Sequence, residues 1–275
     1  MFDLGHFILM PLAILLLMAP DLLSQEPVHI ASISFEGNRA ISTARLKNFI
    51  RNSPEGSSYS AANLESDLQN IRDFYDEGGF LRAQVGPPRV EFQGSGNRKT
   101  AAILIPVSEG PIYILKTMAI KNLHILPTST FMQMSPLTAG KPFSRTKAAQ
   151  WQAKIIDAYR AIGHLNFRCA AQENLYDKSN VVEFILDCTE GNPYSVGRIN
   201  IVGDDSIHPN DFKKRLLISE GGVFNPDLLA YSIQFVNEMH IYRPISNADV
   251  ELRIDPKTCT VDITWHLTLL GKNGK

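Results

Sequence analysis

The stretch FEGNRAIS, residues 35–42, marks an abrupt change in the pattern of apolar residues. Apolar and polar residues alternate over 28–35, which is typical of a half-buried strand. A spacing typical of a helix begins soon afterwards, at Leu46. Gly37 stands between the two patterns, and glycine readily adopts the positive φ of a tight turn. The stretch therefore predicts a strand that ends in a sharp turn and leads into a helix.

This pattern returns twice further along the chain. MAIKN (118–122) and INIVGD (199–204) each end an alternating run at a polar turn, and Gly203 takes the place of Gly37. Three later segments share a helical spacing of apolar residues that stops at a turn: 59–85, 143–169 and 224–250. A pattern that recurs at a regular interval indicates a tandem array of one structural unit.

The longer helix of each unit has start and stop residues of the expected types. Serine and asparagine accept hydrogen bonds from the first free N–H groups of a helix, whereas glycine or proline ends one. The predicted N-caps are Ser60, Ser144 and Asn225. The predicted stops are Gly79, Gly163 and Pro244. Together with Gly37 and Gly203, the two stop glycines are predicted structural turn residues.

Each unit ends in two alternating runs joined by a turn, which is the pattern of a β-hairpin. The predicted strand pairs are 81–92 with 100–107, 166–175 with 181–188, and 246–254 with 260–269. Each unit therefore reads strand–helix–helix–strand–strand, an α+β fold in which two helices cover the apolar face of a three-stranded sheet. We name the units repeat 1, repeat 2 and repeat 3, with predicted bounds 28–110, 111–191 and 192–271.

The sequence lacks the motifs that mark common catalytic, metal and cofactor sites. We therefore expect no enzymatic activity, no bound metal and no cofactor. The formal net charge of −1 gives no support for binding of nucleic acid, which requires a basic surface. One basic cluster, Lys213-Lys214-Arg215, is either a solvated helix face or a contact for anionic lipid or an acidic partner.

The N-terminal segment 1–25 differs from the rest of the chain. Its residues 7–19 form an uncharged apolar stretch whose length fits the core of a signal peptide and is short for a membrane-spanning helix. The preceding residues contain no Lys or Arg. Segment 1–25 is thus either a signal peptide that export removes or an N-terminal anchor that stays attached.

The three cysteines are too few for a scaffold of disulfides. If the hairpin between Cys169 and Cys188 turns at Asp177-Lys178, these two cysteines fall nearly opposite each other on adjacent strands. In an oxidising compartment they could then form a disulfide, and the alternative is two small buried thiols. Cys259 is left over in either case.

Three features together resemble the POTRA (polypeptide-transport-associated) family: ISFEGNRAIS (33–42), the Y-S-x-x-x-L and I-x-x-x-Y-x-x-x-GF spacing over 59–80, and the closing strand pair. The resemblance extends over 28–270, in three copies. The part of the family that the chain resembles is the periplasmic part of BamA-type outer-membrane assembly factors. Because the sequence ends at Lys275, too early for the strands of a barrel, we expect a stand-alone array or a piece of a longer or split protein.

The resemblance implies a function in outer-membrane protein assembly or secretion. It implies an exported protein of a Gram-negative-type bacterium, in the periplasm or at the outer membrane. Its expected partners are proteins, either an outer-membrane β-barrel subunit or unfolded client strands, with no nucleic acid. The alternative is a membrane-tethered scaffold of the cell envelope, as in division proteins that carry this domain.

In this family the second strand of the unit lies at a sheet edge, where an added strand can pair by β-augmentation. The resemblance therefore suggests three partner-binding strands, 81–90, 166–172 and 246–252. The candidate partner-binding residues are Leu81, Ala83, Val85, Phe167, Cys169 and Ala171. The alternative is that prolines such as Pro87, Pro88 and Pro244 block pairing at these edges.

Overall fold

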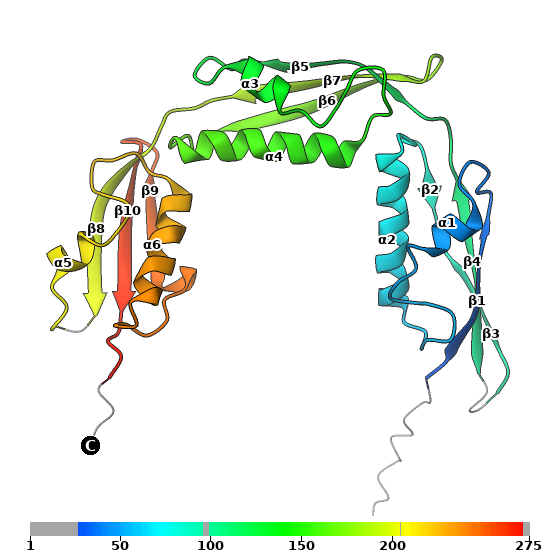
Figure 1. The fold of residues 1–275 in the computed structure, drawn as a ribbon, viewed down its shortest axis with the longest axis horizontal. Helices are drawn as coiled ribbons and strands as arrows, with labels where there is room; N and C mark the ends of the chain where they lie inside the picture. Colours follow the sequence, from blue (N-terminus) through cyan, green and yellow to red (C-terminus); the bar gives the residue numbers. More distant parts are fainter. Residues whose placement is uncertain (1–26, 96–98, 204, 272–275) are drawn as a thin grey trace, which may run out of the picture.

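The structure is a computed structural model that describes residues 27–95, 99–203 and 205–271. The predicted signal peptide or anchor, residues 96–98 of the predicted turn between 81–92 and 100–107, and Asp204 lie outside the described residues. Within the described residues, no helix has the length and apolar character needed to cross a membrane. The three repeats follow one another along an arch, with α2, α4 and α6 on its inner side (Figure 1).

Repeat 1 forms a sheet in which the last strand is central. Its elements are β1 (His29–Glu36), α1 (Thr43–Lys47), α2 (Ala61–Glu77), β2 (Gln84–Val85), β3 (Arg89–Gln93) and β4 (Thr100–Ser108). β4 pairs in parallel with β1 on one side and antiparallel with β2 and β3 on the other. The second strand is split because Pro87 and Pro88 carry no N–H for the ladder.

Repeats 2 and 3 have the same topology. Repeat 2 contains β5 (Ile114–Lys121), α3 (Thr128–Gln133), α4 (Arg145–Ala161), β6 (Arg168–Tyr176) and β7 (Val181–Thr189). Repeat 3 contains β8 (Ser195–Gly203), α5 (Pro209–Lys213), α6 (Pro226–Glu238), the short 3₁₀ helix η2 (Asn247–Asp249), β9 (Val250–Asp255) and β10 (Thr260–Leu267). The strand orders are β5-β7-β6 and β8-β10-β9. The predicted fold class, three β-α-α-β-β units, is confirmed.

Each repeat has its own core between its sheet and its helices. Every second residue of the central strands β4, β7 and β10 is buried, as expected for a sheet with one covered face. The largest fully buried side chains include Tyr75, Trp151 and Trp265, one in each repeat. The first helix of every repeat is only five or six residues long, so α2, α4 and α6 provide most of the cover (Figure 1).

The predicted N-caps of the longer helices are confirmed. The side chains of Ser60, Ser144 and Asn225 each accept a hydrogen bond from an N–H in the first turn. Pro244 as the stop of α6 was wrong, because the helix ends at Glu238 and His240 adopts a left-handed φ of 53°. The Asn237 side chain donates to Ile245 O and accepts from the N–H of Ile245. These two hydrogen bonds give the backbone of Ile245 its partners after the helix has ended early.

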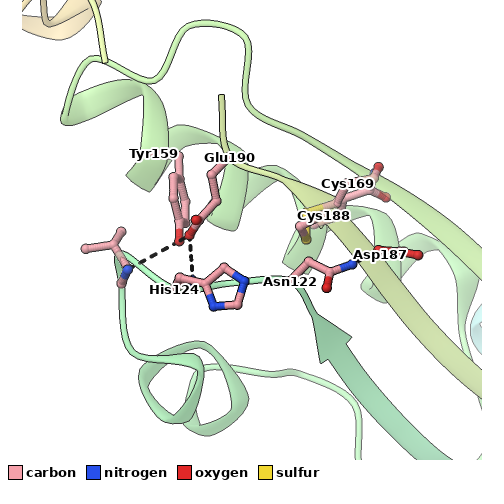
Figure 2. Close-up of a disulfide and its surroundings, with 9 residues drawn as sticks. Asn122, His124, Tyr159, Cys169, Asp187, Cys188 and Glu190 are labelled. Atoms are coloured by element: carbon pink, nitrogen blue, oxygen red, sulfur yellow. Dashed lines mark hydrogen bonds between the residues drawn. A yellow bond between two sulfur atoms is a disulfide. The ribbon is translucent and has the colours of Figure 1, made fainter. Parts of the chain in front are cut away.

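Cys169 of β6 lies directly opposite Cys188 of β7 in the strand register, and the structure joins them by a disulfide (Figure 2). Both cysteines are buried in the core of repeat 2. The bond ties the start of the edge strand β6 to the central strand. Cys259, which lies in the turn between β9 and β10, is free.

Removing this disulfide is expected to destabilise repeat 2. Closing a loop of 19 residues restricts the unfolded chain, and a disulfide of this span contributes about 3 kcal/mol. We expect one reactive thiol in the denatured, unreduced protein and three after reduction. The difference in the free energy of unfolding between the Cys169→Ala, Cys188→Ala variant and the unreduced protein measures what the disulfide contributes. Three thiols before reduction would contradict the expectation, and Cys259→Ser serves as the control.

Candidate functional site

The turn after the first strand requires a residue without a side chain. Gly37 has a φ of 90°, and a Cβ atom there would lie 2.1 Å from the carbonyl oxygen of Val107 on β4. Gly203 has the same relation to β10, because a Cβ atom there would lie 2.0 Å from the carbonyl oxygen of Leu267. In both repeats the first strand therefore packs closely against the end of the central strand. In repeat 2, Asn122 takes this place with a φ of 61°.

A buried glutamate anchors the loop that follows this turn in repeat 1. Glu109, directly after β4, accepts hydrogen bonds from the N–H groups of Arg39, Ala40 and Ile41 at 2.9, 2.6 and 3.0 Å. The Tyr75 hydroxyl on α2 donates to the same carboxylate at 2.8 Å. Burial by itself raises the pKa of Glu109, but these donors outweigh it and hold the pKa below its ordinary value.

Repeat 2 uses the same arrangement. Glu190 accepts hydrogen bonds from the N–H groups of His124 and Ile125 and, at 2.6 Å, from the Tyr159 hydroxyl on α4 (Figure 2). Burial and this hydrogen bond raise the pKa of Tyr159 to about 12. Sequence reasoning did not assign a role to Glu109 or Glu190, although the similar linkers SEGPIY and TEGNPY were the signal. The anchor fixes the loop after the first strand to the long helix and the last strand.

The two junctions between repeats share one backbone hydrogen bond. The N–H of Tyr113 donates to Gly79 O, and the N–H of Tyr194 donates to Gly163 O, both at 2.8 Å. Gly79 and Gly163 have φ values of 83° and 89°. A Cβ atom at either glycine would lie within 3 Å of an atom of the next repeat. The predicted turn glycines thus also allow neighbouring repeats to approach closely.

Polar contacts also join repeat 1 to repeat 2. Asp76 at the end of α2 accepts a hydrogen bond from the N–H of Thr146 in the first turn of α4. Arg145 lies between Asp76 and Glu173 and donates to the carbonyl oxygen of Leu81. The Leu81 side chain packs in the core of repeat 2. Leu81, predicted as an edge residue, is therefore buried at the junction.

The second strand forms a free edge in all three sheets, and the three edges differ in what occupies them. In repeat 1 this edge is short and partly covered. Val85 is buried against α2, Ala83 is half-buried, and Arg72 of α2 donates two hydrogen bonds to Val85 O. Pro87 and Pro88 follow without an N–H, so the outward backbone groups that remain at this edge are those of β3, whose other side pairs with β4.

The edge of repeat 2 is longer, and a side chain of α4 already bonds to one of its outward carbonyl groups. Gln152 of α4 donates to Cys169 O at 2.7 Å, so this carbonyl points away from β7. Because backbone groups alternate in an antiparallel ladder, the outward groups further along β6 belong to Ala171, Glu173 and Leu175. Ala171 is exposed, whereas Phe167 before the strand is buried in the core.

The edge of repeat 3 is open beyond Val250, whose N–H donates to Asn247 O. In the parts of the chain that the structure describes, no side chain donates a hydrogen bond to the backbone of β9. Leu252 and Ile254 pair with Ile263 and Val261, which are fully buried, yet they remain 42% and 52% exposed. These two side chains therefore lie on the same face of the sheet as α6, at the edge that α6 does not cover.

The structure places no group of three or more metal-ligating side chains together among its described residues. What the three sheets offer instead is backbone: outward N–H and C=O groups next to apolar side chains on β6 and β9. Such an arrangement can bind an extended peptide strand.

The chain is similar to known proteins in sequence and in structure. The model of the POTRA family, described as a surface antigen variable number repeat, matches residues 28–110 and 194–268. The outer membrane protein assembly factor BamA of Buchnera aphidicola is 22% identical over 74% of this chain and 34% of its own length. BamA of Neisseria meningitidis is 19% identical over 87% of this chain and 31% of its own length. The chain thus spans about a third of these relatives.

A crystal structure of POTRA domains 3–5 of BamA from Haemophilus influenzae has the same fold. It superposes with a TM-score of 0.66 at 21% identity and covers 90% of this chain and 99% of that one. Because the family match includes more than half of the chain, and the repeats have the topology described above, the family is established. The chain belongs to the POTRA family.

Proposed function

We propose that this chain is a periplasmic protein-binding module that acts in the assembly of outer-membrane proteins. In this proposal, an extended strand of a partner adds to the free edge of β9, and a second strand adds to β6 beyond Cys169. The partner is an outer-membrane β-barrel subunit or an unfolded client strand. The observation that supports the proposal most is the open edge of β9 with its exposed Leu252 and Ile254.

The chemistry of such an edge suits many different clients. Backbone hydrogen bonds supply affinity without requiring a particular sequence, and alternate side chains of the added strand face the same way. On β9 they would meet Leu252 and Ile254, so apolar side chains at every second position are favoured. Strands of outer-membrane barrels have this alternation, with an apolar side chain at every second position. The name of the two relatives, outer membrane protein assembly factor, agrees with this use.

A proline on β9 tests the strand addition. By the alternation found on β6, the outward backbone groups of β9 belong to Val250, Leu252 and Ile254, so Leu252→Pro removes one outward N–H and no ladder bond to β10. We expect this variant to bind a denatured outer-membrane β-barrel polypeptide, diluted from urea, about tenfold more weakly in fluorescence anisotropy. The control Arg253→Ala, on the other face of the strand, is expected to bind normally. Equal binding by Leu252→Pro would refute the role of β9.

Photo-crosslinking in the native host separates this function from the scaffold alternative. Probes at Ala171 and Leu252 are expected to capture outer-membrane barrel proteins or a barrel subunit. Probes at Gln172 and Arg253 project from the opposite face of the same strands, so they are expected to capture the same partner through the other face of the added strand. Capture of inner-membrane division proteins instead would favour the membrane-tethered scaffold.

A further inference from the structure

Repeat 3 exposes four large apolar side chains in one place. Leu228, Tyr231 and Phe235 lie on α6 and are 37%, 59% and 47% exposed. Leu217, 53% exposed, lies beside them, because its N–H donates to Ser232 Oγ, and that hydroxyl donates to Leu228 O. We call these four side chains the α6 patch. Together they make roughly 400 Å² of apolar surface, the size of a patch that is often functional on a monomer.

The α6 patch is specific to repeat 3, as a comparison of equivalent positions shows. The N-caps Ser60, Ser144 and Asn225 align the three long helices. The residues of repeat 1 at the places of Leu217, Leu228, Tyr231 and Phe235 are Asn52, Asn63, Ser66 and Asn70. On α4 of repeat 2, the three helix positions hold Lys147, Gln150 and Lys154. Repeats 1 and 2 thus have the same fold with polar residues at these positions, so packing within the repeat does not explain why repeat 3 has apolar ones.

The spacing of the patch fits a helix. Leu228, Tyr231 and Phe235 follow one another at intervals of three and four residues, which is the narrow stripe along which two helices pack side by side. Leu217 widens the stripe at one end. A second helix laid along α6 would place its own apolar side chains between these residues.

The charges around the α6 patch identify the kind of helix. Lys214 and Arg215 are exposed on the flank next to Leu217, whereas Asp227 and Glu238 are exposed on the opposite flank of α6. A membrane-binding face carries Lys and Arg along its polar side, so the acidic flank argues against anionic lipid. The apolar area of the α6 patch, ~400 Å², is about half of the ~800 Å² per partner that a stable dimer needs, so it suits a single helix better than a second copy of the chain.

We infer that the α6 patch binds an amphipathic helix of a partner protein, with an apolar stripe at intervals of three and four residues. The flank of that helix next to Lys214 and Arg215 is acidic, and its other flank, next to Asp227 and Glu238, is basic. This surface is separate from the edge of β9, so one repeat binds a helix and a strand at two places. The inference does not depend on the proposed strand addition.

The test uses a variant that the chain itself suggests. Leu217→Asn, Leu228→Asn, Tyr231→Ser and Phe235→Asn together install the residues of repeat 1 at the α6 patch. The probe is a fluorescent synthetic helix of three heptads with Leu at the stripe positions, Glu on one flank and Lys on the other. We expect the full chain to bind it, and the fourfold variant to bind it about a hundredfold more weakly. Lys214→Glu with Arg215→Glu is expected to weaken binding about fivefold.

Two controls make the result specific. Lys147→Ser with Lys154→Ser, at the matching places of repeat 2, is expected to leave binding unchanged. The same peptide with Ser in place of Leu is expected not to bind. Unchanged binding by the fourfold variant would overturn the inference. A concentration-dependent dimer that the fourfold substitution abolishes would identify a second copy as the occupant, and flotation with phosphatidylglycerol vesicles that it abolishes would identify a membrane. Either result would also overturn the inference.

Discussion

Gly37→Ala is expected to destabilise repeat 1 by about 3 kcal/mol, because the new methyl group has no room. A Cβ atom at this position would lie 2.1 Å from Val107 O, which belongs to the central strand and cannot move without disturbing the ladder between β1 and β4. The φ of 90° adds backbone strain for any residue with a side chain. Both effects weaken the same strand pair.

The structure provides a control with the same backbone conformation. Gly56 also has a φ of 90°, but a Cβ atom there would have no atom within 4 Å. Gly56→Ala therefore measures the conformational strain alone, about 1 kcal/mol. Amide hydrogen exchange followed by mass spectrometry reports the loss of protection in β1 and β4 separately from that in repeats 2 and 3. Equal effects of the two substitutions would show that the close contact with Val107 is unimportant.

Glu109→Ala is expected to destabilise repeat 1 by about 3 kcal/mol at pH 7, because it leaves the buried Tyr75 hydroxyl and three partly buried N–H groups without their acceptor. The carboxylate now accepts from three backbone N–H groups and from the Tyr75 hydroxyl. Tyr75→Phe removes one of these donors and keeps the carboxylate, so it is expected to cost about 1 kcal/mol. Urea unfolding, followed by hydrogen exchange in repeat 1, gives both values.

The same carboxylate predicts how stability depends on pH. The pKa of Glu109 is lower in the folded chain than its ordinary value, so the unfolded chain binds the proton more readily. The stabilisation is therefore complete above the unfolded pKa of about 4.3 and is lost as the pH falls through the lower folded pKa. We expect the difference in stability between the natural chain and Glu109→Gln to shrink from pH 6 to pH 3. A difference that stays constant over this range would contradict the role of the charge.

The sequence predicts local structure well where a single residue type suits a single conformation. Gly37 as a turn and Ser60 as an N-cap are of this kind, and recurrence along the chain makes the β-α-α-β-β order clear. The end of α6 is not of this kind, because His240 adopts the left-handed conformation usually given to glycine. Only the tertiary hydrogen bonds between Asn237 and Ile245 explain the early end of the helix.

The candidate site could be predicted less completely. The position of the second strand at an edge followed from the family resemblance, but what occupies each edge depends on side chains of the long helix. Arg72 and Gln152 contact the edges of repeats 1 and 2 from α2 and α4, and no sequence pattern marks that contact. Leu81 was assigned to an edge because it begins the alternating run 81–92, which the family resemblance places at an edge, yet its side chain packs in the core of the next repeat. Alternation gives the face of a residue, not the repeat that it contacts.

The position of the last strand at the centre of each sheet has a consequence for the biosynthesis of the chain. β1 ends at Glu36 and its partner β4 begins at Thr100, so at about 5–20 residues per second the first strand emerges several seconds before it can pair. During that interval β1 has no partner strand, and the apolar side of α2 has no sheet to pack against. A chain of which only the residues before Thr100 have emerged would thus expose an incomplete repeat to chaperones and proteases, whereas one that has emerged as far as Glu109 would already hold a closed unit.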